Sequence, residues 1–252
     1  MTSEHGLADM IAHALKRSRA EAGKSFLAEL DQPTTTTEAY QVQSIVNKSY
    51  GPTGGFKVAR KPGETVIMAP IYARDIMPSP ATFDLRGEAE VGIELELGFK
   101  LLSPLPSLDN PEYDTRLREC VALVPVIEIV LSRLANLDQA SPLLRLADNQ
   151  LNGGLIVGPE LHDWWGFDTT SVKANLRLGD NLVLDGVAAV PGGDAWENFR
   201  ALAAMVGSHC GGLLPGHVAI TGSLNGLPWV PAGTPVHAEI CGLGDIDIEF
   251  TS

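Results

Sequence analysis

Apolar residues in the first fifty positions recur at intervals of three and four, which is the spacing of one helix face. They predict an amphipathic helix near the N-terminus and a second helix after residue 35. Thr35 and Glu38 have the spacing of a capping box, which marks the start of the second helix. The expected inward positions are Leu7, Met10, Ile11, Ala14 and Leu15 in the first helix and Ala39, Val42, Ile45 and Val46 in the second.

After a Pro- and Gly-rich segment at 51–63, the apolar period changes to two and short apolar runs alternate with turns. The expected strands lie at 66–71, 91–102, 121–131 and 155–157, in a hairpin around 179–181, and in a closing pair at 236–250. One further helix is expected at 195–210, capped by Asp194. The pattern predicts a single α+β domain over 1–252, with a helical part at 1–50 and a β-rich part at 51–252.

The chain carries 31 Asp and Glu residues against 18 Lys and Arg residues, so its formal charge is −13. This balance argues against a nucleic-acid partner, which needs cations to replace phosphate counterions, and against an anionic membrane surface. No apolar run reaches the roughly 18 to 20 residues of a membrane helix. The first residues lack the basic and apolar regions of a secretion signal, and Cys120, Cys210 and Cys241 lie far apart. We therefore expect a cytoplasmic protein with reduced thiols.

Two carboxylates share one face of the expected strand at 91–102. Alternate residues on a strand point to the same side, so Glu94 and Glu96 lie together, about 7 Å apart along the strand. Gly92 and Gly98 flank them and leave space beside them. A solvated strand face would show the same pattern, and the strand alone leaves that interpretation open.

Glu128 lies inside the most apolar run of the chain, at 121–131. An unpaired carboxylate in a strand buried on both faces would cost several kcal/mol or be protonated, so Glu128 needs a cation. Arg133 is the nearest basic residue, but its odd offset places it on the opposite face of a strand. Two interpretations remain open: an ion pair with some basic residue, or a metal shared with Glu94 and Glu96. Three carboxylates suit Mg²⁺ or Mn²⁺.

Several segments, taken in order, resemble the 2-keto-4-pentenoate hydratase and 4-oxalocrotonate decarboxylase branch of the fumarylacetoacetate hydrolase family. The resemblance extends from about Ala39 to the C-terminus. The segments are Ile93–Phe99, Ile127–Arg133, Ala147–Asn149 with Gly153–Gly158, Thr221–Leu227, Pro231–Gly233 and Gly242–Ile246.

The resemblance implies a β-rich roll of mixed sheets around a central site, with the N-terminal helices packed outside. It implies Mg²⁺ or Mn²⁺ held by Glu94, Glu96 and Glu128, and a lysine, Lys57, that reaches the substrate. A cation near three carboxylates and an anionic substrate is electrostatically sensible. The alternative is a solvated loop lysine. Because Lys57 lies in a Gly- and Pro-rich segment, we expect its truncation to lower turnover more than stability.

Further site residues are expected from the same resemblance. Thr221, Gly222 and Ser223 follow a short strand and could hold a carboxylate or enolate, or form a plain turn. Asn149 could be a site amide or a loop cap. The hydratases usually continue the lysine segment as Lys-hydrophobic-Gly-Leu-Thr-Ser and carry a paired Asp-Asp-Met. This chain has Arg60 in the first segment and Arg74 beside Asp75 in the second, so both arginines are expected near the substrate.

The implied function is a divalent-metal-dependent lyase acting on a small 2-oxo or 2-enol carboxylate, most similar to 2-hydroxypenta-2,4-dienoate hydratase, which yields 4-hydroxy-2-oxopentanoate. Lys57 and Asp75 are the candidates for moving protons. The carbon–carbon hydrolases of the family use a His–Glu pair, and no histidine lies between His13 and His162. Decarboxylation of a 2-oxo dicarboxylate is the alternative reaction, with Arg60 or Arg74 holding the second carboxylate. A catalytically silent metal-binding relative is the alternative of another class. We expect a homo-oligomer whose partner is a small-molecule 2-oxo acid.

Overall fold

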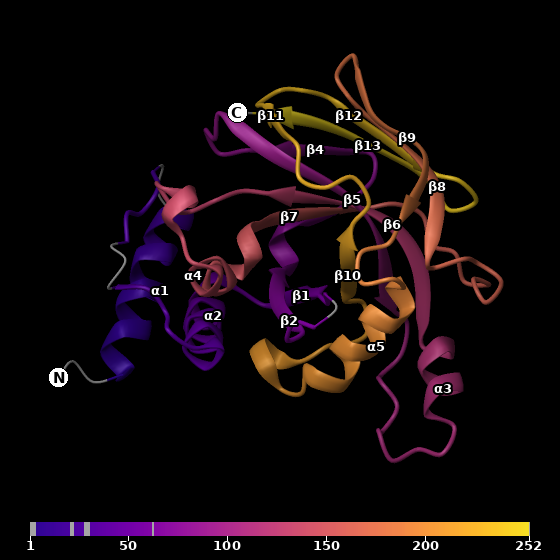
Figure 1. The fold of residues 1–252 in the computed structure, drawn as a ribbon, viewed down its shortest axis with the longest axis horizontal. Coiled ribbons are helices and arrows are strands. Elements are labelled where there is room, and N and C mark those ends of the chain that lie inside the picture. Colours follow the sequence, from indigo (N-terminus) through magenta and orange to yellow (C-terminus); the bar gives the residue numbers. More distant parts are fainter. Residues whose placement is uncertain (1–3, 21–22, 28–30, 62, 252) are drawn as a thin grey trace.

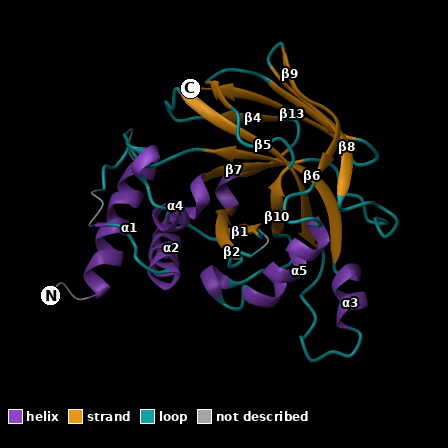
Figure 2. Cartoon of the chain, in the orientation of Figure 1, coloured by secondary structure: helices purple, strands orange, loops and turns teal. Residues whose placement is uncertain are grey.

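The computed structural model describes residues 4–20, 23–27, 31–61 and 63–251, and for Glu4 and His5 the backbone alone. Two mixed sheets form the body, with helices outside them (Figures 1 and 2). The eight-stranded sheet has the order β2 (Ile67–Tyr72), β1 (Thr53–Ala59), β10 (Val218–Ser223), β5 (Glu90–Leu101), β6 (Val121–Val130), β7 (Asn152–Val157) and β3 (Ile76–Pro78), and β11 (Trp229–Pro231) pairs with β5. The five-stranded sheet has the order β4 (Ala81–Asp84), β13 (Gly244–Thr251), β12 (Val236–Ile240), β8 (Ser171–Leu178) and β9 (Asn181–Ala189).

The eight-stranded sheet curls on itself. β2 lies near one end of the strand order and β7 near the other, yet the two strands contact each other. A small buried cluster fills the space between them and includes Ile71 of β2, Val126 of β6 and Leu155 of β7. The sheet is therefore a roll with an interior, as the sequence motifs predict.

Strand register decides which side chains face that interior. Glu94 of β5 pairs directly with Glu128 of β6, and Lys57 of β1 pairs with Ile220 of β10. Because side chains alternate along each strand, these residues share the inner face. The intervening residues of β5, such as Leu95 and Leu97, point outward into the main hydrophobic core.

The main core lies between the two sheets and beneath the helix α5 (Ala195–Met205). Phe99 is at the centre of an aromatic cluster, with ring centroids 5.3 Å from Trp164, 5.5 Å from Trp196 and 5.0 Å from Phe199. Such edge and tilted contacts add to the large apolar area that these rings bury. α5 contacts β10, β1 and β5, so this packing holds the helix against the strands of the roll.

The N-terminal helices form a separate layer outside the roll (Figure 1). α1 (Glu4–Ala20), α2 (Thr36–Tyr50) and α4 (Pro142–Ala147) bury a second cluster together with Tyr72 and Leu134. The predicted capping box at Thr35 and Glu38 is present. The predicted stripe of α1 needs one correction, because Met10 is 41% exposed and Ala8 and Ala12 are buried instead. A short helix, α3 (Tyr113–Glu119), precedes β6.

The α+β fold class predicted from the sequence is confirmed. Within the part of the chain that the structure describes, no helix is both long and apolar enough to span a bilayer. Residues 1–3, which contributed to the expectation about a secretion signal, lie outside the described residues.

Candidate metal centre and active site

Three carboxylates converge inside the roll. One carboxylate oxygen from each of Glu94, Glu96 and Glu128 lies within 4.8 Å of the other two. Glu94 and Glu128 meet because they are register partners on β5 and β6, and Glu96 lies two residues further along the same face. Glu128 and Glu96 are buried, and Glu94 is partly exposed.

Lys57 is the cation that Glu128 requires. Its Nζ donates to both carboxylate oxygens of Glu128 at 2.7 Å and to the carbonyl of Gln150 at 3.2 Å. Asn152 Nδ2 donates to Glu128 Oε1 at 2.8 Å. Arg133 pairs with Asp148 instead. Lys57 is no loop lysine: it lies on β1 and its side chain is 11% exposed. The premise behind a small stability effect is therefore wrong, and we expect truncation of Lys57 to lower stability as well as turnover.

The charges of the cluster perturb one another. Burial, followed by the charge of Glu128, raises the pKa of Glu94 to about 8. Burial, and then the charges of Glu128 and Glu94, raise the pKa of Glu96 well above its usual range. Burial alone would lower the pKa of Lys57, but attraction by Glu128, Glu94 and Glu96 outweighs it and raises that pKa. The cluster is therefore short of positive charge, and Lys57 is a cation at neutral pH.

The segment 221–223, at the end of the neighbouring strand β10, holds the Glu96 carboxylate. The Gly222 N–H donates to Glu96 Oε2 at 2.6 Å, with a backbone φ of 119° that favours glycine. Thr221 Oγ1 donates to the Leu97 carbonyl at 2.8 Å, and Ser223 Oγ donates to the Gly226 carbonyl at 2.6 Å. These contacts fix the end of β10 beside Glu96.

A cavity of about 210 Å³ opens onto the cluster. It is lined by the segments 57–61 and 221–223 and by Glu94, Glu96, Gln150 and Pro191. Arg60 and Lys61 place two further cations in the cavity lining. The sequence-predicted residues Lys57, Arg60, Thr221, Gly222 and Ser223 are thus brought together with Glu94 and Glu96.

Arg74 and Asp75 lie elsewhere. Asp75 is buried and pairs with Arg86 at 2.8 Å, and the Arg74 guanidinium lies 4.7 Å from the centroid of the Tyr50 ring. Neither lines the cavity, so we correct the expectation that they face the substrate. Both residues follow β2. Because β2 runs antiparallel to β1, the end of β2 lies beside the start of β1, away from Arg60.

Asn149 also has another role, since its Nδ2 donates to the Pro70 carbonyl of β2 at 3.1 Å. Its neighbour Gln150 lines the cavity instead. Residues 149–151 have φ values of 52°, 51° and 65°, a left-handed run that determines which of them faces the cavity. Sequence reasoning missed Gln150 and Asn152. An amide beside Gly153-Gly154 was a weak signal for Asn152, and no signal distinguished Gln150.

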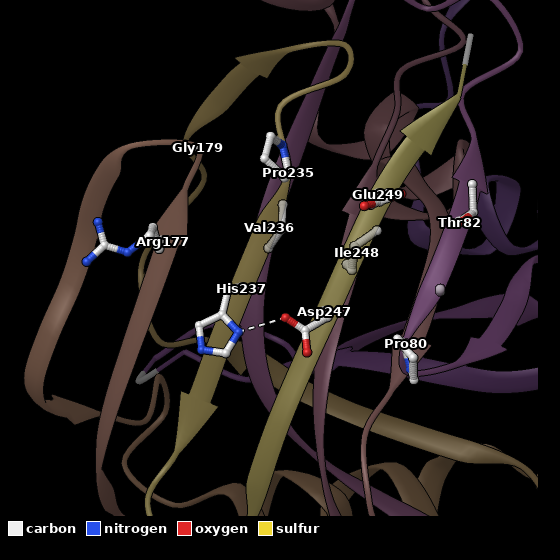
Figure 3. Close-up of a pocket in the computed structure, with 11 residues that line it drawn as sticks. Pro80, Thr82, Arg177, Gly179, Pro235, Val236, His237, Asp247, Ile248 and Glu249 are labelled. Carbon is white, nitrogen blue, oxygen red and sulfur yellow. Dashed lines mark hydrogen bonds and ion pairs between the residues drawn. The ribbon is translucent and has the colours of Figure 1, made fainter.

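A larger hollow, of about 470 Å³, lies on the open face of the five-stranded sheet (Figure 3). His237 of β12 and Asp247 of β13 face each other there, with 2.8 Å between Nδ1 and Oδ1. Both side chains are about half exposed, so water screens their charges. Size alone does not make this hollow the site, because the converging carboxylates lie at Glu94, Glu96 and Glu128 instead.

The residues of the cluster fit a divalent cation. Three carboxylate oxygens from rigid, paired strands are the hard ligands that Mg²⁺ and Mn²⁺ prefer. Burial and then repulsion between the carboxylates raise the pKa values of Glu94 and Glu96, and added positive charge would relieve that repulsion. The partly exposed Glu94 and the cavity leave a route for an ion and a ligand to enter.

No protein-family profile and no curated protein sequence matches the chain significantly. Solved structures do resemble it. One is 4-oxalocrotonate decarboxylase from Pseudomonas putida G7 complexed with magnesium and adipate, with TM-score 0.81 and 17% identity, covering 100% of this chain and 99% of that one. The same decarboxylase complexed with calcium and acetate gives equal values.

A more distant structure is fumarylpyruvate hydrolase from Pseudomonas aeruginosa in complex with Mn²⁺ and pyruvate. Its TM-score is 0.55 at 14% identity, and the match covers 78% of this chain and 88% of that one. The decarboxylase match extends through the N-terminal helices to the end of the chain. Over its whole length, this chain has the fold of the fumarylacetoacetate hydrolase type that its sequence motifs predict.

Proposed function

We propose that the chain is a divalent-metal-dependent lyase of the fumarylacetoacetate hydrolase family, acting on a small 2-oxo or 2-enol carboxylate. The observation that carries this proposal is the convergence of Glu94, Glu96 and Glu128 beside Lys57, at a cavity inside the roll. The three carboxylates would be the metal ligands, and the bound ion would be Mg²⁺ or Mn²⁺. The free cysteines fit a reducing cytoplasm. A homo-oligomer stays a prediction.

A divalent cation held by Glu94, Glu96 and Glu128 would supply Lewis-acid stabilisation of negative charge at the substrate's 2-oxygen. Lys57 is protonated at neutral pH, so it can hold an anionic substrate or return a proton to carbon. Gly222 fixes Glu96 through its N–H. The curled sheet separates the site from bulk water on the side of its buried strands, where charge interactions are stronger.

Hydration of 2-hydroxypenta-2,4-dienoate to 4-hydroxy-2-oxopentanoate is the first reaction to consider, because the sequence motifs are most similar to those of the hydratases that catalyse it. Decarboxylation of a 2-oxo dicarboxylate is the second, and two observations favour it. Arg60 lines the cavity and can receive a second carboxylate. Asp75, the other candidate for moving protons in a hydration, lies outside the cavity lining.

The test is a spectrophotometric screen of the dienol acid and of 2-oxo dicarboxylates, with Mg²⁺ or Mn²⁺ and with or without chelator. We expect steady turnover of one class that chelator abolishes. Glu128→Gln should abolish turnover as well, because the amide keeps the shape and loses the charge. Glu249→Gln is the matched control, since Glu249 is exposed on β13 beside the other hollow.

The outcomes separate the alternatives. Turnover lost in Glu128→Gln and kept in Glu249→Gln supports the lyase site. Metal binding without turnover of any tested acid indicates the silent relative. Equal turnover in both variants places the chemistry elsewhere in the molecule.

A further inference from the structure

Asn198 is a buried polar residue in a helix that otherwise presents an apolar face. It lies on α5 and is 1% exposed, and its neighbours in the helix, Trp196 and Phe199, are buried as well. Burying an amide costs free energy unless each donor and acceptor is paired. The partners of Asn198 therefore show what the residue does.

All three partners belong to segments that line the cavity. Nδ2 donates to the Pro191 carbonyl at 2.7 Å and to the Thr221 carbonyl at 2.9 Å. Oδ1 lies 3.5 Å from Nη1 of Arg60. Asn198 thereby uses both donors and its acceptor, and it joins the loop after β1, the 191–192 loop and the end of β10. Figure 1 shows α5 beside these strands, and the helix contacts both β1 and β10.

Two of the three connections, those to Thr221 and Arg60, lead to groups that matter for the proposed function. Thr221 precedes Gly222, whose N–H donates to Glu96 at 2.6 Å. Arg60 Nη1 also donates to the Gly192 carbonyl at 3.0 Å, which leaves Nη2 and Nε without a recorded partner among the described residues. Gly192 is required at this junction, because a Cβ there would lie 2.5 Å from the Arg60 carbonyl and 2.8 Å from Asn198 Oδ1.

We propose that Asn198 is a positioning residue that sets the cavity's recognition of a ligand's distal carboxylate. It holds Arg60 at one side of the cavity and the turn that presents Gly222 to Glu96 at the other. It touches neither metal nor substrate and acts through these two segments. The part that concerns ligand choice rests on the proposed function, whereas the positioning of the segments does not.

Asn198→Asp is the sharpest perturbation. It keeps the size of the side chain, replaces both N–H donors by an oxygen that faces two carbonyls, and draws Arg60 into an ion pair. Asn198→Ser, which can donate one bond, serves if the first variant does not fold. Asn181→Asp is the matched control, because Asn181 is exposed at the start of β9.

The first readout is hydrogen–deuterium exchange of the metal-free protein, followed by mass spectrometry. We expect the peptide that contains 221–223 to exchange at least about tenfold faster in Asn198→Asp than in wild type. Peptides of β8 and β9 should be unchanged, and Asn181→Asp should resemble wild type. Faster exchange spread evenly over the whole chain, or no change at 221–223, would overturn the proposal.

The second readout is the dissociation constant of 2-oxoglutarate relative to pyruvate, measured by calorimetry with Mg²⁺. Asn198→Asp should lower the preference for the dicarboxylate roughly tenfold. In a protein that already carries Arg60→Ala, adding Asn198→Asp should not change this preference further, because the effect of Asn198 acts through Arg60. An unchanged preference would overturn the role in ligand choice. If wild type binds neither acid, the proposed function fails, and the exchange experiment still decides whether Asn198 positions the two segments.

Discussion

Truncation of Lys57 is the perturbation whose effect the structure specifies most closely. In Lys57→Ala, Glu128 loses two contacts of 2.7 Å and keeps Asn152 as its recorded hydrogen-bond partner. Glu128 has no exposed surface, and the Lys57 side chain is 11% exposed. Removing one partner of a buried ion pair costs about 3 to 5 kcal/mol. For a chain of this length, that corresponds to a fall in melting temperature of roughly 6 to 20 °C.

The assay is thermal unfolding of the metal-free protein, repeated with Mg²⁺. Lys100→Ala is the matched control, because Lys100 pairs with Glu160 at 2.6 Å while both side chains are about one-third exposed. Such a surface pair contributes about 0 to 1 kcal/mol. We expect Mg²⁺ to restore much of the stability lost in Lys57→Ala, since an ion replaces the missing positive charge beside Glu128. Equal melting temperatures for Lys57→Ala and Lys100→Ala would refute this reasoning.

Three further predictions follow from the same cluster. Mg²⁺ at a hundred times its dissociation constant should stabilise wild type by about 2.7 kcal/mol, and a thermal-shift titration should show most of this gain lost in Glu128→Gln and kept in Glu249→Gln. Between about pH 4.5 and pH 8, Glu94 is protonated in the metal-free fold and ionised in the unfolded chain, because its pKa is raised from 4.5 to about 8. Stability in urea should therefore fall as the pH rises through this window, and Glu94→Gln should make the fall less steep, while Glu96, whose pKa is also raised, keeps part of it. Arg60→Ala should raise KM for a 2-oxo dicarboxylate by roughly tenfold and leave KM for a monocarboxylate nearly unchanged; Arg74→Ala should alter neither value.

The elements of the fold were largely predictable because local patterns determine them. Alternation predicts β5, a continuous apolar run predicts β6, and the capping box predicts the start of α2. The predicted helix at 195–210 was too long, since α5 ends at Met205. Gly207 adopts a left-handed φ of 48° just beyond that end, which is a common way for a helix to stop.

The chemistry of the site was predictable in part. A carboxylate in an apolar strand must have a cation, and this argument alone selects Glu128. Burial and periodicity could not identify its ion-pair partner, because Lys57 is 71 residues away and reaches Glu128 across the interior of a curled sheet. Only the family resemblance places Lys57 near the three carboxylates. The sequence leaves a metal and an ion pair as alternatives for Glu128, whereas the structure brings Lys57 and the three carboxylates to one place.

The two arginines show how strand register limits a prediction made from motifs. β1 and β2 run antiparallel, with Ala59 opposite Ile67 and Thr53 opposite Tyr72. Residues that follow each strand therefore lie at opposite ends of the pair, roughly 20 Å apart for strands of this length. A substrate that fits a cavity of about 210 Å³ cannot reach both ends. Arg60, which follows β1, is thus available to a ligand beside Lys57, whereas Arg74, which follows β2, packs on Tyr50 at the end of α2.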